Sequence, residues 1–264
     1  MTARGDLLVL AESSGSTEVG FHYVYAFDLD GAPEADFGDG GSISLNIKAD
    51  KLFVTEDAIH PLGAHHDAIA FPKYGLDGAL DTTFGNQDPV GGLRYMAAAT
   101  PLQDVTEVRD FIIDDDGTIR VGAQTAPSTS GFHRDWGLAR FTQVTNDYRS
   151  DQFLDFKFTS TRNVLHDLVH RHEGGYLAAG QSYEDNKKSA YVLAMRADGQ
   201  VDDALGDNGT FEFSFSDMTN NSEIVALWPD GEAYRLLGNI ESLRAGTSDP
   251  SRIVVRRFDP HAEP

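Results

Sequence analysis

Three histidines lie close together in the segment HDLVHRHE, which begins at His166. Alternate side chains of an extended strand share one face, so His166, His170 and His172 are expected together, with the last two about 6.6 Å apart along the strand. Neutral imidazoles at this spacing are suited to share a zinc ion. The simpler interpretation is a half-buried His170 bonded to a backbone carbonyl, with two exposed companions. The segment therefore predicts a zinc site or an ordinary strand end.

A second group of histidines lies in EDAIHPLGAHHD, which begins at Glu56. It contains His60, His65 and His66 together with acidic residues, and it is predicted to be a loop between two strands. Binding residues collect on loops that a rigid scaffold positions. The segment therefore predicts a ligand-binding site, with a solvated polar loop as the alternative.

Acidic turns form a third group, in FDLDG from Phe27, IDDDG from Ile113 and VDDALGDNG from Val201. They resemble fragments of calcium loops, but none has the twelve-residue order that ends in Glu. Tight turns favour Asp-Gly for structural reasons alone. Asp114 and Asp116 also have the residue type of a glycosidase pair. No cofactor is firmly predicted, and a divalent metal, zinc or calcium, is the alternative.

The chain contains no GxSxG elbow, P-loop or GxGxxG fingerprint, so it lacks the common motifs of serine hydrolases and of nucleotide-binding enzymes. With no cysteine, disulfides, thiolate catalysis and cysteine-bound zinc are excluded. The 42 acidic and 21 basic residues give a formal charge of −21. This charge disfavours nucleic acid and anionic membranes as partners. Adaptation to high salt is another reason for such a charge.

The N-terminal segment MTARGDLLVLAES has an apolar run that is too short for a signal-peptide core. No stretch approaches the roughly 20 apolar residues that a membrane-spanning helix needs. The sequence therefore predicts a chain without membrane insertion, in a mature form.

The elements that must position these residues recur along the chain. A strand, an Asp-Gly turn and a later Gly occur in VYAFDLDGAPEADFG, IAFPKYGLDGALDTTFG and VLAMRADGQVDDALG. The two glycines of each segment are seven residues apart: Gly31 and Gly38, Gly78 and Gly85, Gly199 and Gly206. LARF from Leu138 and VVRRF from Val254 fit the same strand, which brings the occurrences to five.

A second motif, two strands around a Gly-containing turn, has its turn glycines at Gly117, Gly174 and Gly231, spaced by 57. Aligned on this turn, two columns of residues are expected to lie in the core: Ile47, Ile113, His170 and Leu227, and, two residues earlier, Leu45, Phe111, Leu168 and Val225.

The alternation of apolar residues with a period of two, without helical periodicity, predicts an all-β fold. A repeat of this length with four strands is typical of a propeller blade. We expect one β-propeller domain over residues 1–264, with about five four-stranded antiparallel blades and approximate repeats 1–47, 48–113, 114–170, 171–227 and 228–264. The four strands of the fourth blade are expected to begin at Gly175, Ala190, Gly209 and Glu223. A β-solenoid or a sandwich is the alternative.

These motifs resemble the delta-60-type repeat of bacterial β-propellers. The likeness is closest at Pro229-Asp230-Gly231, Leu138-Ala139-Arg140, Asp77-Gly78, Leu80-Asp81 and Phe84-Gly85. The first copy begins directly at the second strand and the last is truncated, so either the terminal blades are trimmed or the natural protein is longer. The resemblance implies a bacterial propeller of an exported or surface protein, without a general catalytic motif. A cytoplasmic location is the alternative.

From these features we expect a non-enzymatic binding or scaffolding propeller that recognises a protein or a carbohydrate. The alternative is a hydrolase or lyase with acidic and histidine side chains in the central channel, with or without a divalent metal.

Overall fold

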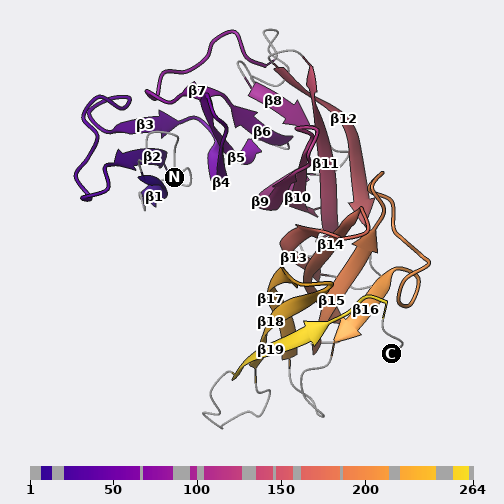
Figure 1. Cartoon of the computed structure of the whole chain (residues 1–264). Helices are drawn as coiled ribbons and strands as arrows, with labels where there is room; N and C mark the ends of the chain where they lie inside the picture. Colours follow the sequence, from indigo (N-terminus) through magenta and orange to yellow (C-terminus); the bar gives the residue numbers. More distant parts are fainter. Residues whose placement is uncertain are drawn as a thin grey trace. The chain divides into compact units, whose positions relative to one another are not determined.

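A computed structural model describes residues 7–13, 21–65, 68–85, 96–99, 104–126, 135–144, 147–156, 162–184, 187–213, 221–241 and 252–261 (Figure 1). The regular structure in these ranges is antiparallel β-sheet, and they contain no helix, so the expected all-β class is confirmed. No helix of the described residues is long and apolar enough to cross a membrane.

The chain divides into two compact units. Unit 1 comprises Met1–Val108, Asp115–Ile119 and Ala139–Phe153, and unit 2 comprises Arg109–Asp114, Arg120–Leu138 and Leu154–Pro264. The single domain over 1–264 and the repeat boundaries stay predictions.

Unit 1 contains two sheets. The first has the order β1-β2-β3, with β1 (Leu7–Ser13), β2 (Phe21–Phe27) and β3 (Ser42–Leu45). The second has the order β4-β5-β6-β8, with β4 (Lys48–Val54), β5 (Ala58–His65), β6 (Ala68–Pro72) and β8 (Met96–Ala99), and β7 (Tyr74–Gly75) pairs with β5. Apart from β7, strands that follow one another in the chain are thus neighbours in each sheet.

A third sheet contributes residues to both units and has the strands β9 (Asp104–Ile113), β10 (Ile119–Ala126), β11 (Asp135–Val144) and β12 (Asp147–Phe156). Unit 2 contains two further sheets. One comprises β13 (Arg162–His170), β14 (Tyr176–Glu184), β15 (Lys187–Met195) and β16 (Thr210–Phe213). The other comprises β17 (Asn221–Asp230), β18 (Ala233–Glu241) and β19 (Arg252–Phe258).

The strand composition of the predicted fourth blade is wrong by one strand. The strand that contains Glu223 is β17, which pairs with β18 in the following sheet, and β13 occupies the first position of the β13-β14-β15-β16 sheet. The predicted copy starts at Gly175, in the turn after β13, and so leaves out the strand that opens the sheet. The Gly-containing turn is easier to recognise in the sequence than the start of β13. The sheets have three to five strands, and a closed ring of four-stranded blades stays a prediction.

Three connecting loops have the same hydrogen bonds at corresponding positions. In the first, Asp28 N–H donates to Ala32 O and Glu34 N–H donates to Ala26 O. The loop after β15 has the bonds Arg196 to Gln200 and Asp202 to Ala194, each 168 residues later, and the loop after β7 has Gly75 to Ala79 and Asp81 to Lys73. The turn glycines Gly31, Gly78 and Gly199 have φ values of 83°, 83° and 86°, a left-handed conformation that favours glycine.

The two expected core columns are only partly buried. Leu45, Ile47, Leu168 and Leu227 are buried, whereas Ile113, Val225 and His170 are exposed. Val225 lies at a β-bulge, where the register of β17 shifts between Ile224 and Ala226. A bulge adds one residue to a strand and so disturbs the period of two on which the columns depended.

Each unit has its own apolar core. In unit 1, Val24, Ala26, Ile43 and Ile59 pack in one cluster with other buried residues, and the rings of Phe53, His60, Phe71, Phe84, Phe141 and Tyr148 form an aromatic cluster. In unit 2, Leu177, Val192, Ile224 and Leu236 share a cluster, and Trp136 packs with Leu165, Leu168 and Met195 in another. The strands therefore bury the apolar faces that their alternation predicts.

Aspartates link the first strands of successive sheets. Asp50 of β4 accepts a hydrogen bond from the N–H of Val108 in β9, and Asp110 of β9 accepts one from Leu168 in β13, both at 2.9 Å. Asp167 of β13 accepts one from Leu227 in β17. A charge-assisted bond from a backbone donor therefore recurs at intervals of about one copy.

Candidate functional site

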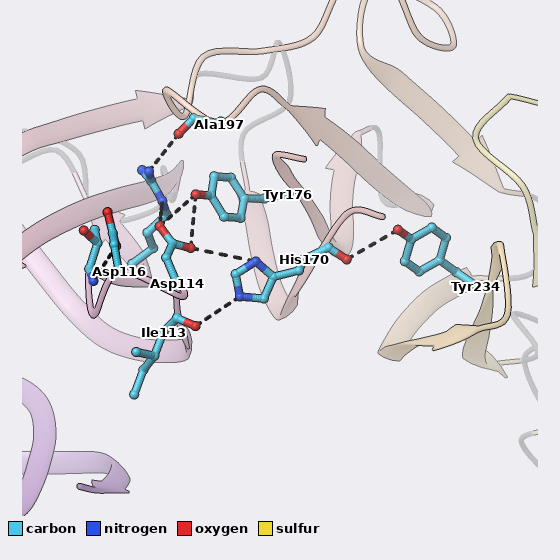
Figure 2. Close-up of polar contacts among 9 residues, drawn as sticks. Ile113, Asp114, Asp116, His170, Tyr176, Ala197 and Tyr234 are labelled. Atoms are coloured by element: carbon cyan, nitrogen blue, oxygen red, sulfur yellow. Dashed lines mark hydrogen bonds and ion pairs between the residues drawn. The ribbon is translucent and has the colours of Figure 1, made fainter. Parts of the chain in front are cut away.

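Arg120 is the centre of a polar cluster in unit 2 (Figure 2). It lies at the start of β10, is 5% exposed, and donates from Nε to Asp114 Oδ2 at 3.0 Å and from Nη2 to the carbonyl oxygen of Ala197 at 2.7 Å. Its guanidinium also lies 4.5 Å from the ring centre of Tyr176. The positive charge is thus buried but paired, as burial of a charge requires.

Tyr176, the first residue of β14, completes the contacts of Asp114. Its hydroxyl donates to Asp114 Oδ2 at 3.0 Å and lies 3.2 Å from Oδ1 (Figure 2). Burial raises the pKa of Tyr176 to about 12. The hydroxyl therefore stays protonated at neutral pH and acts as a hydrogen-bond donor.

His170 lies at the edge of this cluster, and its ring is half exposed. Its Nε2 lies 3.2 Å from the carbonyl oxygen of Ile113, and its Nδ1 lies 3.8 Å from Asp114 Oδ1 (Figure 2). The carbonyl contact is the one that the simpler interpretation of the histidine segment anticipated. Nε2 is therefore within hydrogen-bond distance of a backbone carbonyl oxygen, whereas Nδ1 faces the Asp114 carboxylate at a longer distance.

His172 turns toward a different neighbour. Its backbone N–H donates to the Tyr234 hydroxyl at 2.9 Å, and its ring centre lies 5.2 Å from that of Tyr234. The same hydroxyl lies 3.4 Å from the carbonyl oxygen of His170 (Figure 2). Tyr176 and Tyr234 therefore have equivalent roles, because each stands near the start of a second strand and its hydroxyl reaches the turn of the preceding sheet.

A hollow of about 400 Å³ lies next to these turns in unit 2 and is lined by Arg171, His172, Glu173, Glu232, Tyr234, Asp259, Pro260 and His261. Arg171 Nη1 lies 2.6 Å from Asp202 Oδ2, and this hydrogen bond lowers the pKa of Asp202. His261 Nε2 lies 3.0 Å from Glu173 Oε2. Since the Arg171 charge is matched by Asp202, the exposed carboxylates of Glu173, Glu232 and Asp259 dominate the electrostatics of the hollow.

His166 does not share the environment of His170 and His172. The register of β13 shifts between Leu165 and Asp167, so His166 is the additional residue of a bulge. The alternation that placed the three histidines on one face assumed a regular strand. The expected common face is therefore wrong, because the bulge changes the side to which the following residues point.

The second histidine group is not the predicted loop. Ala58–His65 forms β5, and His60 is buried in the aromatic cluster of unit 1, where its ring stacks on Phe53 at 4.5 Å. His60 Nδ1 lies 3.2 Å from the carbonyl oxygen of Pro72. His65 is half-buried at the end of β5, and His66 lies outside the described residues. A binding role for His60, His65 and His66 stays a prediction without support from this geometry.

The acidic turns use some of their carboxylates within the turns and others in contacts with distant residues, such as Asp202 with Arg171. Asp28 Oδ1 accepts from the N–H groups of Asp30 and Ala32, and Asp116 Oδ1 accepts from Thr118 N–H at 2.9 Å. Asp114 belongs to the Arg120 cluster. Within the described ranges, no group of three or more His, Asp or Glu side chains could hold a metal ion. Zinc and calcium binding stay predictions.

Arg120, both tyrosines and most of the residues that line the hollow were not predicted from the sequence. The tyrosines had a visible signal, since GGY and GEAY occur after equivalent turns. Arg120 had none, because its partners Asp114 and Ala197 come from two separate turns.

Comparison with models of protein families, with curated proteins and with solved structures found no match for this chain.

Proposed function

We propose that this chain is a non-enzymatic binding or scaffolding protein, a β-propeller of delta-60-type repeats whose five sheets are its blades. The antiparallel sheets formed from consecutive strands support this architecture, as do the loops with matching hydrogen bonds. The recurring aspartate bonds between first strands also suit blades that pack in succession. Export or surface display belongs to the same proposal and rests on the family resemblance.

The hollow of unit 2 is the proposed binding site, and its ligand is a positively charged segment of a partner protein. The observation that carries this proposal is the set of exposed carboxylates, Glu173, Glu232 and Asp259, around an arginine that Asp202 already neutralises. Lysine or arginine side chains complement such a site. A carbohydrate is less suited, because the Tyr234 ring is 1% exposed and offers no face for stacking on a sugar.

A hydrolase or lyase is the second candidate, and the Asp114 and His170 pair is the observation that favours it. We place it second because His170 Nε2 already faces the carbonyl oxygen of Ile113. A general base needs a nitrogen within hydrogen-bond reach of the proton that it takes.

The test uses a fluorescein-labelled hexa-arginine peptide and fluorescence anisotropy. The variant Glu173→Gln/Glu232→Gln removes two carboxylates of the hollow, and Asp198→Asn/Asp203→Asn removes two exposed carboxylates that do not line it. We expect the first variant to weaken binding at least about fivefold and the second less than twofold, because a local site depends more on its own charges than on the net charge. Equal weakening by both variants would show that only the overall charge attracts the peptide, and the site would be refuted.

A further inference from the structure

The first sheet corresponds to the last three strands of the β13-β14-β15-β16 sheet. The bonds Ala26 to Gly41 and Gly41 to Phe37 between β2 and β3 recur as Ala194 to Gly209 and Gly209 to Leu205 between β15 and β16. The offset of 168 residues matches β2 to β15 and β3 to β16, so β1, which pairs with β2, corresponds to β14. On its other edge, β14 pairs with β13.

The corresponding edge of β1 borders a groove. Among the described strands, β1 pairs with β2 alone. The groove has a volume of about 400 Å³ and is lined by Leu7, Leu8, Leu10, Asp50, Lys51, Leu52 and Val54, which come from β1 and β4. Leu7 is 52% exposed and Val9 is 38% exposed. Apolar side chains thus flank a strand edge that no second strand of the described residues pairs with.

The N–H of Leu52 in β4 corresponds to the N–H groups of Leu168 and Leu227. Each of these leucines lies two residues after the extra residue of a bulge: Asp50 in β4, His166 in β13 and Val225 in β17. The N–H groups of Leu168 and Leu227 donate to Asp110 and Asp167, which belong to the first strand of the preceding sheet. The groove beside Leu52 is thus where an equivalent aspartate would lie.

The hydrogen-bond alternation of β4 agrees with this assignment. Thr55 N–H donates to Ala58 O, so the next pair outward, Val54 with Ile59, is a non-hydrogen-bonded pair. In an antiparallel ladder the two kinds of pair alternate, which makes Leu52 with Pro61 non-hydrogen-bonded as well. The N–H of Leu52 therefore points away from β5, toward the open side of β4.

We infer that the groove between β1 and β4 is a strand-docking site for an extended segment of a partner protein other than a second copy of this chain. This segment pairs with the edge of β1, places apolar side chains at alternate positions on the leucines, and directs an aspartate carboxylate to the N–H of Leu52. The first strands β4, β9, β13 and β17 are already paired in their own sheets, so none of them is this segment. Backbone pairing of this kind supplies affinity, and alternate side chains supply specificity.

The test uses a labelled synthetic peptide with the sequence of residues 162–173, RNVLHDLVHRHE, as the probe. We expect saturable binding in fluorescence anisotropy, and about tenfold weaker binding of the peptide with Asp167→Asn, because the neutral amide oxygen accepts a weaker hydrogen bond than the carboxylate does. In hydrogen exchange, the bound peptide should slow the Leu52 amide and leave the Leu227 amide unchanged. This second readout distinguishes the groove from displacement of the chain's own β13.

The matched protein variants are Leu7→Lys, in the groove, and Ile253→Lys, on β19, where the side chain is 79% exposed. Leu7→Lys should weaken peptide binding at least tenfold, and Ile253→Lys should leave it unchanged. No saturable binding, or equal loss in both variants, would overturn the inference. A dimer in sedimentation without peptide that Leu7→Lys dissociates would also overturn it, because a second copy would then occupy the groove. The hollow of unit 2 plays no part in these measurements, so their failure leaves its proposed role intact.

Discussion

Asp110 Oδ2 accepts a hydrogen bond from the backbone N–H of Leu168, 58 residues later in the chain, at 2.9 Å. Asp167 Oδ1 approaches the same N–H at 3.0 Å, so two carboxyl groups share one donor. Two ionised carboxylates at such a site repel each other. Burial and the hydrogen bond with Asp110 raise the pKa of Asp167 from 3.8 to about 7.

This pair predicts that the contribution of Asp167 to stability falls as pH rises from about 4 to about 7. The folded chain binds the Asp167 proton more tightly than the unfolded chain, so protonation favours the folded state and its loss costs stability. Asp167→Asn should reduce the slope of unfolding free energy against pH. The reduction should be less than about 1.4 kcal/mol per pH unit, which is the largest slope that one titrating proton can produce. Urea unfolding at several pH values measures it. Asp198→Asn, at an exposed turn, is the control, and an identical pH profile in both variants would contradict the assignment.

His60 predicts a pH dependence of opposite sign. Burial lowers its pKa from 6.5 to about 4, so the folded chain keeps the ring neutral where the unfolded chain binds a proton. The contribution of His60 to stability should therefore fall as pH decreases from about 6.5 to about 4, by on the order of 3 kcal/mol. The measured profile is the sum of this effect and the opposing effect of Asp167, so each is read from its own variant. His60→Phe retains an aromatic ring beside Phe53 and should lack this loss. Acid titration followed by circular dichroism tests it, and equal acid sensitivity in the variant would refute the prediction.

Arg120 and Arg235 provide a matched comparison of two ion pairs. Each arginine bonds the carboxylate of a nearby turn, Asp114 at 3.0 Å and Asp230 at 2.8 Å, but the Arg120 side chain is 6% exposed and that of Arg235 is 48% exposed. Arg120→Ala should cost about 3 kcal/mol of unfolding free energy, the lower end for a buried pair, because it leaves the Asp114 carboxylate, 17% exposed, without its cation. Arg235→Ala should cost about 0–1 kcal/mol. Chemical denaturation compares them, and similar losses would show that burial does not decide the difference.

Gly180 and Gly122 occupy similar places in β14 and β10 but tolerate a methyl group differently. A Cβ at Gly180 would lie 2.1 Å from the Val164 carbonyl oxygen, whereas one at Gly122 would lie 2.4 Å from the tip of the Leu165 side chain. Backbone cannot move aside as a leucine methyl can, so Gly180→Ala should cost about 1–3 kcal/mol and Gly122→Ala less. Thermal unfolding gives the order, and a larger loss for Gly122→Ala would reverse the argument.

Much of the local structure could be predicted because its causes lie within a few residues. Asp28 and Gly31 form a turn through contacts inside the loop itself, so the Asp-Gly pattern located it correctly. The histidines were harder. His60 resembled a loop residue by composition, yet β5 buries it among aromatic rings that come from other strands.

The candidate site depends on contacts between distant segments. Arg120 donates to the carbonyl oxygen of Ala197, 77 residues away, and Tyr234 reaches the turn at His170 and His172. Neither the repeat period nor any sequence motif predicts that these turns lie in contact with distant residues. The bulge at His166 is equally invisible, because it follows from how β13 pairs with β14.

By itself, the sequence determined the all-β class, the antiparallel order of consecutive strands and the positions of the Asp-Gly turns, since alternation and turn chemistry are local properties of the chain. Only the tertiary structure decided which strand opens each sheet, which carboxylate pairs with the buried Arg120, and that Leu52 faces a groove. These outcomes depend on packing between segments that are far apart in sequence, where burial and pairing, rather than residue type, set the role of each side chain.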